Sequence, residues 1–510
     1  MKKTSAILLA GALLLTGCGS KGVSQSPSES AGVSAGESSP VANNDDVVIT
    51  LGWANGQTYD WGIETTAENS MKHFIDEFNA KDNGVRVEVK IFSELEEFKN
   101  YGYDERGSYQ GYSDDECKQM DFFISQELIN KDTVDIISKN SFCNPAKYEI
   151  FKRKGAFADL YKFMEDDPDV NRDTLNSHIL DLCEYEGGLY SIPTNYIVNT
   201  MIGKSEYVGT KQNWTIDEFI DSWNAMPAGS MVNHSLTAEY IYYDVLRANT
   251  SAFIDYDKFE THFDHPDFRK MLEFCKGFES NMGQKLEGAY DQSRPNLVEL
   301  YRIWGYNGAI YEDVDYANNT VDYPHIRDGE MTLVGFPTSD GRGAYLHGGG
   351  GFGDISIRAN TSEEKQEAAW KFIREFYLEE FQLENFAQAN EYTDHENGQP
   401  AKTWTILSGF PINNAARKTT AERFMSGYYD NVNYTLSVQN KVCKDNLTQA
   451  DIDFMDDYIS SIDRWGAGTD RELFNIVEYE VLAYLKGEQD IDTTVDVIQN
   501  RANIWISEQM

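Results

Sequence analysis

A strand, a helix and a second strand follow one another in residues 47–91, and this pattern limits the chain to an α/β fold. The apolar segment Val47–Leu51 has the length of a short buried strand, and a turn-rich loop follows it. Apolar residues recur at helical spacing over Met71–Phe78, and Gly84 closes that helix. In Val85–Ile91 apolar and charged residues alternate, as in a half-buried strand. Two strands joined through a helix form a βαβ unit, which predicts parallel pairing in a sheet.

The rest of the chain continues this alternation of strands and helices. Thr215 with Glu218 and Thr361 with Glu364 match the capping box, in which the first and fourth residues bond each other's backbone at a helix start. Residues 46–510 are too many for one typical core, so the sequence predicts two lobes. The further elements expected are a short strand at 134–137 and helices at 155–165, from 214, from 361 and at 495–505.

The N-terminus has the pattern of an export signal. A positive start precedes the apolar stretch Ala6–Leu15, which is too short to span a membrane. Small residues then lead to Cys18, in a pattern that resembles the bacterial lipobox, where the signal is removed and the cysteine carries lipid. We therefore expect residues 1–17 to be a lipoprotein signal peptide and 18–45 to be a lipidated cysteine with a disordered tether. The alternative is an ordinary signal peptide in which the cysteine is incidental.

Charge and cysteine content narrow the possible partners. The formal net charge of −40 disfavours nucleic acid and anionic lipid surfaces, and weighs more weakly against polyanionic ligands. Solubility alone is the commoner reason for such a charge. Five scattered cysteines do not form a disulfide framework, so we expect at most two bridges and otherwise small buried side chains. These cysteines, besides Cys18, are Cys117, Cys143, Cys183, Cys275 and Cys443.

No motif marks a catalytic, cofactor or metal centre. The glycines of 348–353 match a dinucleotide-binding spacing, but a strand-like segment follows where phosphate binding needs a helix. Residues 167–178 resemble the start of a calcium loop but lack its glycine and its closing glutamate. His262, Asp264 and His265 are too few and too close together for a zinc site. We expect no cofactor, no metal and no enzymatic chemistry, although carboxylates are too abundant to exclude a glycosidase pair by counting.

Several segments, in their order along the chain, carry a resemblance to a known family. Each segment is a weak signal by itself, and the ordered series is specific. They are Gly155–Leu160, Gly187–Pro193, Trp214–Glu218, Val334–Gly341, and Ala368–Ile373 after the strand-like Asp354–Arg358. The series resembles the bacterial extracellular solute-binding proteins of family 1, the maltose-binding type, over nearly the whole chain after the tether.

This resemblance implies the type II periplasmic-binding-protein fold, which is α/β with two lobes that face each other across a cleft. Both lobes are discontinuous, because the chain crosses between them about three times. We place these hinge crossings near Thr194, Tyr301 and Leu378; the stretch Asp244–Tyr323 matches the family least well, so the second crossing is the least determined. The implied lobes are 46–194 plus 301–378 at the N-terminal side and 195–300 plus 379–510 at the C-terminal side.

Aromatic side chains with amides at their edges suit a carbohydrate, which presents apolar C–H faces and polar rims. The chain is 13% aromatic, and most of these rings are expected in the core. We therefore select residues in loops after strands and at the crossings, where ligands of open α/β sheets bind. The candidate ligand-binding residues are Trp53, Tyr59, Asp60, Trp61, Asn140, Asn195, Tyr196, Trp304, Tyr306, His347 and Phe352.

The resemblance implies binding rather than catalysis. We expect a substrate-binding lipoprotein of an ABC transporter, which captures a carbohydrate, in particular an oligosaccharide, and delivers it to membrane permease subunits. The chain is then a monomer on the outer face of the cytoplasmic membrane, held there by its lipid anchor only, and it binds no nucleic acid. A binder of peptides or other small solutes on the same fold, and a surface glycan hydrolase, remain as alternatives. The sequence does not name the sugar, its length or its linkage.

Overall fold

The computed structural model describes most of the chain from Asp46 onward. The fold described below belongs to the unit formed by residues 44–510. The described residues are 46–54, 71–102, 111–129, 133–233, 245–278, 294–311, 313–315, 320–322, 324–348, 354–386, 388–393, 400–405, 409–425, 447–466 and 470–508.

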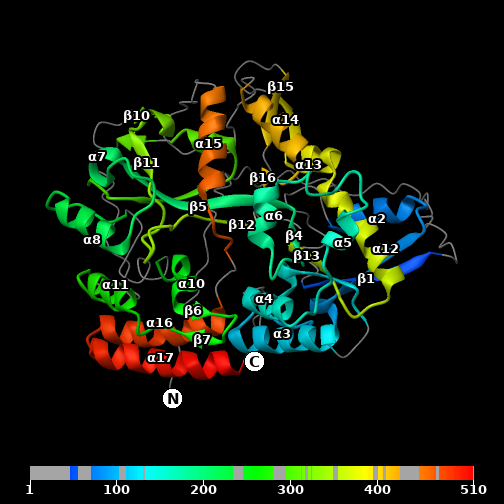
Figure 1. Cartoon of the computed structure of the whole chain (residues 1–510), viewed down its shortest axis with the longest axis horizontal. Coiled ribbons are helices and arrows are strands. Elements are labelled where there is room, and N and C mark those ends of the chain that lie inside the picture. The colour runs from blue at the N-terminus through cyan, green and yellow to red at the C-terminus, as the bar shows by residue number, and fades with distance from the viewer. Residues whose placement is uncertain are drawn as a thin grey trace, which may run out of the picture. The chain divides into compact units, whose positions relative to one another are not determined.

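The first sheet confirms the βαβ unit that opens the folded part of the chain. Its strands are β1 (Val47–Trp53), β2 (Val85–Ile91), β3 (Ile136–Ser138), β4 (Ile192–Pro193) and β13 (Asp354–Ile357). They lie in the order β2-β1-β3-β13-β4; β1, β13 and β4 are labelled in Figure 1. β1 pairs in parallel with β2 and β3, whereas β13 pairs antiparallel with β3 and β4. A strand from late in the chain therefore lies inside a sheet that the early chain builds.

Helices cover both faces of this first sheet. α2 (Met71–Ala80) and α12 (Glu363–Ile373) pack against its strands on the face that buries Leu51. α3 (Asp114–Ile129) and α4 (Pro145–Arg153) share a second apolar cluster with Phe92 and Ile137 on the other face. Gly52 faces that second cluster, and a Cβ there would lie only 2.9 Å from the Phe92 ring, so glycine permits this close packing.

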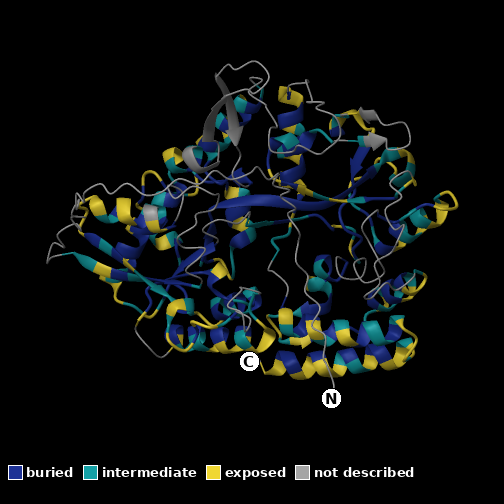
Figure 2. Ribbon diagram, turned by 180° about the vertical axis from the view of Figure 1, so that it is seen from behind, coloured by how far each residue is buried: buried dark blue, intermediate teal, exposed yellow. Residues whose placement is uncertain are grey.

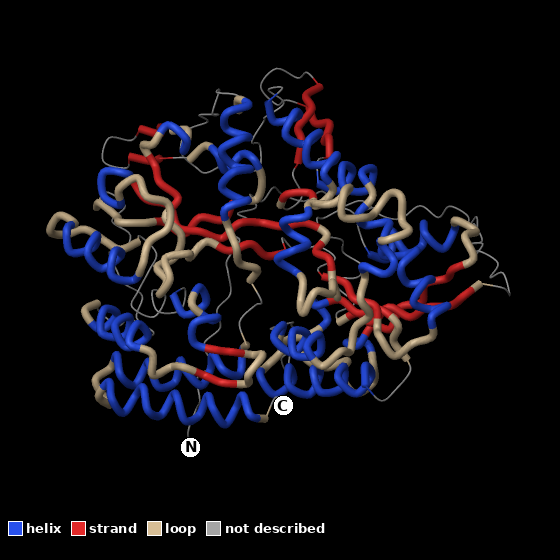
Figure 3. Tube along the Cα trace, viewed as in Figure 1, coloured by secondary structure: helices blue, strands red, loops and turns tan. Residues whose placement is uncertain are grey.

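The second sheet is built around β5 (Asn195–Lys204), of which all but the last residue is buried (Figure 2). Four strands pair antiparallel with it: β8 (Glu299–Ile303), β11 (Met331–Leu333), β12 (Tyr345–Gly348) and β16 (Phe410–Pro411). The registers place β11 and β12 along one edge of β5 and β8 and β16 along the other. Figure 3 shows the strands of both sheets in red, with helices around them.

Successive residues of β5 enter different apolar clusters, because side chains alternate across a strand. Val198 and Ile202 belong to the cluster that includes α15 (Gln449–Ser461), and the Thr200 hydroxyl contacts the Tyr458 hydroxyl at 2.8 Å. Met201 faces the opposite cluster, which contains α8 (Ile216–Ala225), α11 (Pro266–Lys276), α16 (Arg471–Leu485) and α17 (Ile491–Ser507). α16 and α17 pack side by side at the edge of this cluster (Figure 1).

The sheets show where the chain passes from one to the other. β4 ends at Pro193 in the first sheet and β5 begins at Asn195 in the second, so this passage is at Thr194. The return was expected near Tyr301, but β8, β11 and β12 all pair within the second sheet. The chain therefore returns between β12 and β13, after Gly348, because segment 299–348 finds its hydrogen-bond partners on β5. The two α/β layers are as expected, and the full lobe boundaries stay a prediction.

Two local expectations need correction. The helix predicted at 155–165 is only the single turn α5 (Tyr161–Met164), because Phe157 instead bridges to Arg358 beside the first sheet. α12 begins after Ser362, whose side chain accepts a hydrogen bond from the Lys365 amide, rather than at a capping box of Thr361. The capping box of α8 and the helix around 495–505, which is α17, are confirmed.

The remaining elements are short or peripheral. No described helix is long and apolar enough to cross a membrane. The other helices are α6 (Ser177–Cys183), α7 (Ser205–Val208), α10 (Thr250–Phe253), α13 (Glu379–Phe386) and α14 (Asn414–Met425). The other strands are β6 (Ile254–Asp255), β7 (Glu260–Thr261), β9 (Asp313–Asp315), β10 (Thr320–Asp322), β14 (Gln388–Thr393) and β15 (Pro400–Thr405). The 3-10 turns are η2 (Phe92–Glu94), η3 (Lys139–Ser141), η4 (Tyr306–Ala309), η5 (Ile326–Asp328) and η6 (Arg374–Tyr377).

Candidate functional site

One face of the second sheet gathers polar and aromatic side chains close to the passage between the sheets. Asn199 of β5 lies opposite Tyr345 of β12 on one side and Arg302 of β8 on the other. Ile197 lies opposite His347 one pleat nearer the passage. Residues directly opposite in antiparallel strands project to the same face, so these five side chains share one surface. We call this surface, formed by Ile197, Asn199, Arg302, Tyr345 and His347, the ladder face.

His347 presents a neutral imidazole on the ladder face. Burial lowers its pKa to about 4, and the positive charges of Arg247, Arg302 and Lys139 oppose protonation further. Its Nδ1 lies 2.6 Å from the Gly348 carbonyl oxygen, which only accepts hydrogen bonds, so Nδ1 carries the proton. The Nε2 atom of this tautomer is an acceptor. His347 therefore offers a ligand hydroxyl a hydrogen-bond acceptor at neutral pH.

Asn199 supplies a donor beside that acceptor. Its side chain is 5% exposed, and its Nδ2 has no hydrogen-bond partner within the part of the chain that the structure describes. A buried amide nitrogen without a partner costs free energy, which a ligand acceptor would recover. Asn199 lies between Tyr345 and Arg302 on the same face of the sheet, so its side-chain nitrogen is close to the other polar groups of the ladder face.

Tyr345 is the aromatic member of the ladder face. Its ring lies 6.2 Å from the His347 ring and 5.7 Å from the Phe336 ring, centroid to centroid. The segment that carries Gly466 runs along β12, since the Gly466 amide donates to the Leu346 carbonyl at 2.7 Å. A Cβ at Gly466 would lie 2.9 Å from the Tyr345 ring, so this chain segment approaches the ring as closely as glycine allows.

A buried charge network stands where β3 ends and β13 begins. The Lys139 ammonium lies 3.2 Å from Glu149 and 3.5 Å from Asp354. Burial alone would lower the pKa of Lys139, but these carboxylates raise it to about 12. Burial would likewise raise the pKa of Glu149, but Lys139, Lys152 and Arg153 lower it to about 2. Lys139 and Glu149 stay charged at neutral pH, while burial raises the pKa of Asp354 and Lys139 opposes that rise. The network joins the end of β3 to the start of β13.

The structure buries four of the residues selected from the sequence: Trp53, Asn195, Tyr196 and Tyr306. Tyr196 and Tyr306 are 0% and 1% exposed and pack on Phe410, on the opposite face from the ladder. Tyr306 donates to Asp456 at 2.8 Å, and Tyr196 is bonded to Asn176 at 3.2 Å. Their selection as ligand contacts is therefore corrected: both are core residues, because even-numbered positions of β5 and the turn η4 face α15. Asn195, at the passage, is also buried. Trp53 ends β1 with 6% exposure and packs in the core.

The other selected residues lie at different places. His347 is half-buried on the ladder face, and Trp304, directly after β8, is 38% exposed. Asn140 is exposed in η3, where its amide donates to the Ser138 hydroxyl at 3.2 Å. The following selected residues lie outside the described residues: Cys18, Tyr59, Asp60, Trp61 and Phe352.

Sequence reasoning missed Asn199, Arg302 and Tyr345. Asn199 is in the middle of β5, Arg302 is next to the last residue of β8 and Tyr345 is the first residue of β12. The residues selected from the sequence were instead those in loops after strands and at the predicted crossings. Alternation within 195–204 is hidden in the sequence, because this strand is apolar on both faces and carries Asn and Thr on opposite sides. Only the registers of β8 and β12 with β5 bring the three together.

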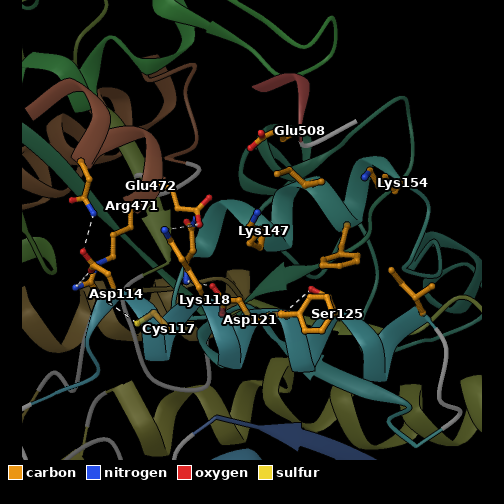
Figure 4. A pocket seen from close by; sticks show the side chains of 16 residues that line it. Asp114, Cys117, Lys118, Asp121, Ser125, Lys147, Lys154, Arg471, Glu472 and Glu508 are labelled. Carbon is orange, nitrogen blue, oxygen red and sulfur yellow. Dashed lines mark hydrogen bonds and ion pairs between the residues drawn. The ribbon is translucent and has the colours of Figure 1, made fainter. Parts of the chain in front are cut away.

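A separate cavity of about 340 Å³ lies between α3, α4 and the N-terminal end of α16 (Figure 4). Apolar side chains such as Phe122 and Phe151 and charged groups of both signs line it. Arg471 bonds Asp114 at 2.6 Å across one side of it. Among the described residues, no group of three or more His, Cys, Asp and Glu side chains is placed to hold a metal ion.

Comparison with known proteins found similar solved structures but no similar sequence. No family model and no curated protein matches the sequence. The structure is similar to an ABC substrate-binding protein from Listeria monocytogenes in complex with cycloalternan, at 13% identity and a TM-score of 0.45, over 91% of this chain and 100% of that one. It is also similar to the sugar-binding protein MalE from Xanthomonas citri, at 11% identity and a TM-score of 0.45, over 91% and 98%.

A third solved structure, a periplasmic oligogalacturonide binding protein from Yersinia enterocolitica, is 11% identical with a TM-score of 0.48, over 91% of this chain and 100% of that one.

Proposed function

We propose that the chain is an extracytoplasmic substrate-binding protein that captures a carbohydrate and delivers it to a membrane permease. The passage of the chain between two sheets is the observation that supports this most directly. The chain leaves the first sheet at Thr194 and returns after Gly348, and the ladder face lies on the strands at both points. A ligand bound there touches the segments that connect the two α/β layers, which suits a protein that closes on its ligand by hinge motion.

The ladder face has the chemistry for sugar hydroxyls. The Nε2 atom of His347 accepts a hydrogen bond, while Asn199 and Arg302 donate. Tyr345 and the exposed Trp304 supply aromatic surface for the apolar face of a sugar ring. Closure is driven only by contacts that the ligand makes better in the closed form than in the open one. No reaction is part of this proposal, because binding and release suffice for delivery.

The location and assembly belong to the same proposal. The residues before Cys18 act as a lipoprotein signal, and Cys18 then carries the lipid that holds the chain at the outer face of the cytoplasmic membrane. The segment 19–45 serves as the tether, and the chain works as a monomer. The permease and its ATPase are other chains. The lipobox-like pattern and the polar tether sequence support this.

A binding screen tests the proposal. The purified chain is heated with neutral oligosaccharides, acidic oligosaccharides, peptides and polyamines, since a ligand that binds only the folded state raises the melting temperature. We expect one carbohydrate class to raise it, with no product after prolonged incubation. Tyr345→Ala should weaken that ligand about tenfold, or ~1.4 kcal/mol. Tyr479→Ala, an equal truncation at a side chain 69% exposed on α16, is the matched control and should leave affinity unchanged.

Other outcomes of this screen have definite meanings. A shift with peptides or polyamines alone rules out the carbohydrate assignment and keeps a solute-binding function. Formation of shortened glycans identifies a hydrolase instead. If a carbohydrate binds the Tyr345→Ala and Tyr479→Ala variants with equal affinity, the ladder face is not its binding site.

A further inference from the structure

Two cysteines lie together in the wall of the cavity between α3, α4 and α16. Cys117 is in the first turn of α3 and lines this cavity (Figure 4). Cys143 directly precedes Asn144, the N-cap residue of α4. The Cys143 amide bonds Asp121, one helical turn after Cys117, and each thiol shifts the pKa of the other as a hydrogen-bonding neighbour. The two cysteines are 26 residues apart in the sequence, so the fold creates this pair.

Hydrogen bonds fix the backbones that carry the two thiols. Asp121 lies one helical turn after Cys117, and its carboxylate accepts from the Cys143 amide at 2.8 Å and from the Asn144 amide at 3.0 Å. Asp121 is 4% exposed, so these bonds are shielded from water. The start of α4 is thus held against the turn of α3 that presents Cys117. Both cysteines are free thiols in this structure.

The surroundings of Cys117 favour reaction with a disulfide reagent. The hydrogen bond from the Cys143 thiol lowers the pKa of Cys117, burial opposes this, and the guanidinium of Arg471 lowers it further. The Arg471 Nη1 atom lies 3.4 Å from the Cys117 sulfur. The thiolate is the attacking form of cysteine, and a neighbouring arginine stabilises it. The cavity gives a reagent access to this sulfur, although the side chain is 6% exposed.

We propose that Cys117 and Cys143 are a disulfide pair in the functional protein. The Cys117 thiolate attacks a sulfur of a low-molecular-weight disulfide such as oxidised glutathione and releases one glutathione thiolate. Cys143 then loses its proton and attacks the Cys117 sulfur, which releases the second glutathione thiolate. Two protein thiols are oxidised to one disulfide, and one glutathione disulfide is reduced to two thiols. An exported chain meets oxidising conditions, which keep such a bond formed.

The other cysteines in the described chain are placed elsewhere. Cys183 is buried in the cluster of the first sheet, and Cys275 lies on α11 in the cluster with α16 and α17. The bond closes a loop over residues 117–143 and so reduces the freedom of the unfolded chain. It also stiffens the start of α4, where the side-chain Nδ2 of Asn144 donates to Asp470, the N-cap residue of α16, at 3.0 Å. Oxidation therefore stabilises the wall of the cavity.

Thiol mapping on the full chain tests the pair. The purified protein is incubated with oxidised glutathione, quenched in acid, unfolded in guanidinium and alkylated, and its peptides are identified by mass spectrometry. We expect Cys117 and Cys143 to escape alkylation together, in one cross-linked peptide pair, while Cys183 and Cys275 are alkylated. Reductant should lower the melting temperature of the oxidised protein by several degrees. The double variant Cys117→Ser/Cys143→Ser should melt at one temperature with and without reductant.

The matched control is Cys183→Ser, which removes a buried thiol and should keep the reductant-dependent shift. Full alkylation of Cys117 and Cys143 after glutathione treatment overturns the pair, as does a bridge from either to another cysteine. The mapping needs only wild-type protein, so it decides the question even where the double variant does not fold. The treatment supplies its own oxidant, so failure of the proposed export does not affect this result; a pair that forms with glutathione but is reduced in cells contradicts the location alone.

Discussion

At the scale of single residues, the protonation of His347 is decided by its neighbours rather than by imidazole itself. Its half-buried place on β12 and the charges of Arg247, Arg302 and Lys139 keep it neutral. The same residue was selected from the sequence only because it precedes a glycine run. The sequence therefore predicted a polar residue near the passage, but not its tautomer or charge, which depend on groups from three separate segments.

The depressed pKa of His347 predicts that the folded protein loses stability as the pH falls below neutral. The folded-state pKa of about 4 is below the ordinary value of 6.5, so the unfolded state binds the proton more readily. Stability from this group is present above pH 6.5 and is lost as the pH falls toward 4, by at most about 2 kcal/mol at pH 5. Urea unfolding at pH 7 and pH 5 should show a smaller loss for His347→Gln than for wild type.

His262→Gln is the matched control, because the His262 side chain is 47% exposed. Its unfolding free energy should fall between pH 7 and pH 5 by the same amount as that of wild type. An acid loss in His347→Gln equal to that of wild type would show that His347 does not titrate with a depressed pKa.

At the scale of elements, helix starts separate what local sequence decides from what it does not. At α8 the capping box of Thr215 and Glu218 forms as predicted, with the Thr215 amide donating to Glu218 at 2.8 Å. The same pattern at Thr361 is wrong, because the Thr361 hydroxyl donates to Asp135 of the first sheet at 2.8 Å. Ser362 then caps α12 in its place. A local motif forms when no tertiary partner competes for its side chain.

The contribution of the α8 cap to the stability of the protein can be measured. Thr215→Ala removes the acceptor for the Glu218 amide, which lies 3.2 Å from the Thr215 hydroxyl. We expect the free energy of unfolding to fall by about 1 kcal/mol, the usual cost of an N-cap. Thr210→Ala, an exposed threonine that precedes the helix, is the control and should change it by less than about 0.5 kcal/mol. Equal effects in the two variants would contradict the capping role.

At the scale of the whole folded unit, one polar contact joins helices that belong to different clusters. Asp470 caps α16 through the Leu473 amide at 2.9 Å and also accepts from the Asn144 side chain of α4 at 3.0 Å. α4 packs with the first sheet, whereas α16 packs with the helices of the second. Asp470 is 2% exposed. Its loss therefore leaves the buried side-chain nitrogen of Asn144 without this acceptor.

Because Asp470 has both roles, its substitution should destabilise the protein more than substitution of an ordinary N-cap residue. Asp470→Ala should lower the free energy of unfolding by about 2–3 kcal/mol, since it removes a cap and a buried side-chain hydrogen bond. Asp490→Ala is the matched control, because Asp490 caps α17 through the Thr493 amide at 2.8 Å from an exposed position. In denaturant unfolding, Asp490→Ala should lower the free energy of unfolding by less than Asp470→Ala does. Equal decreases would show that the contact between α4 and α16 does not contribute to stability.

The sequence by itself determined the α/β class, the βαβ unit of β1, α2 and β2, and the helices α8 and α17. These follow from apolar spacing and from caps, which act between residues close in the chain. Tertiary structure decided that the chain returns to the first sheet after Gly348, that Tyr196 and Tyr306 are core, and that Asn199, Arg302 and Tyr345 share one face. Those outcomes depend on which strands pair and in which register, and pairing is a property of segments that are distant in sequence.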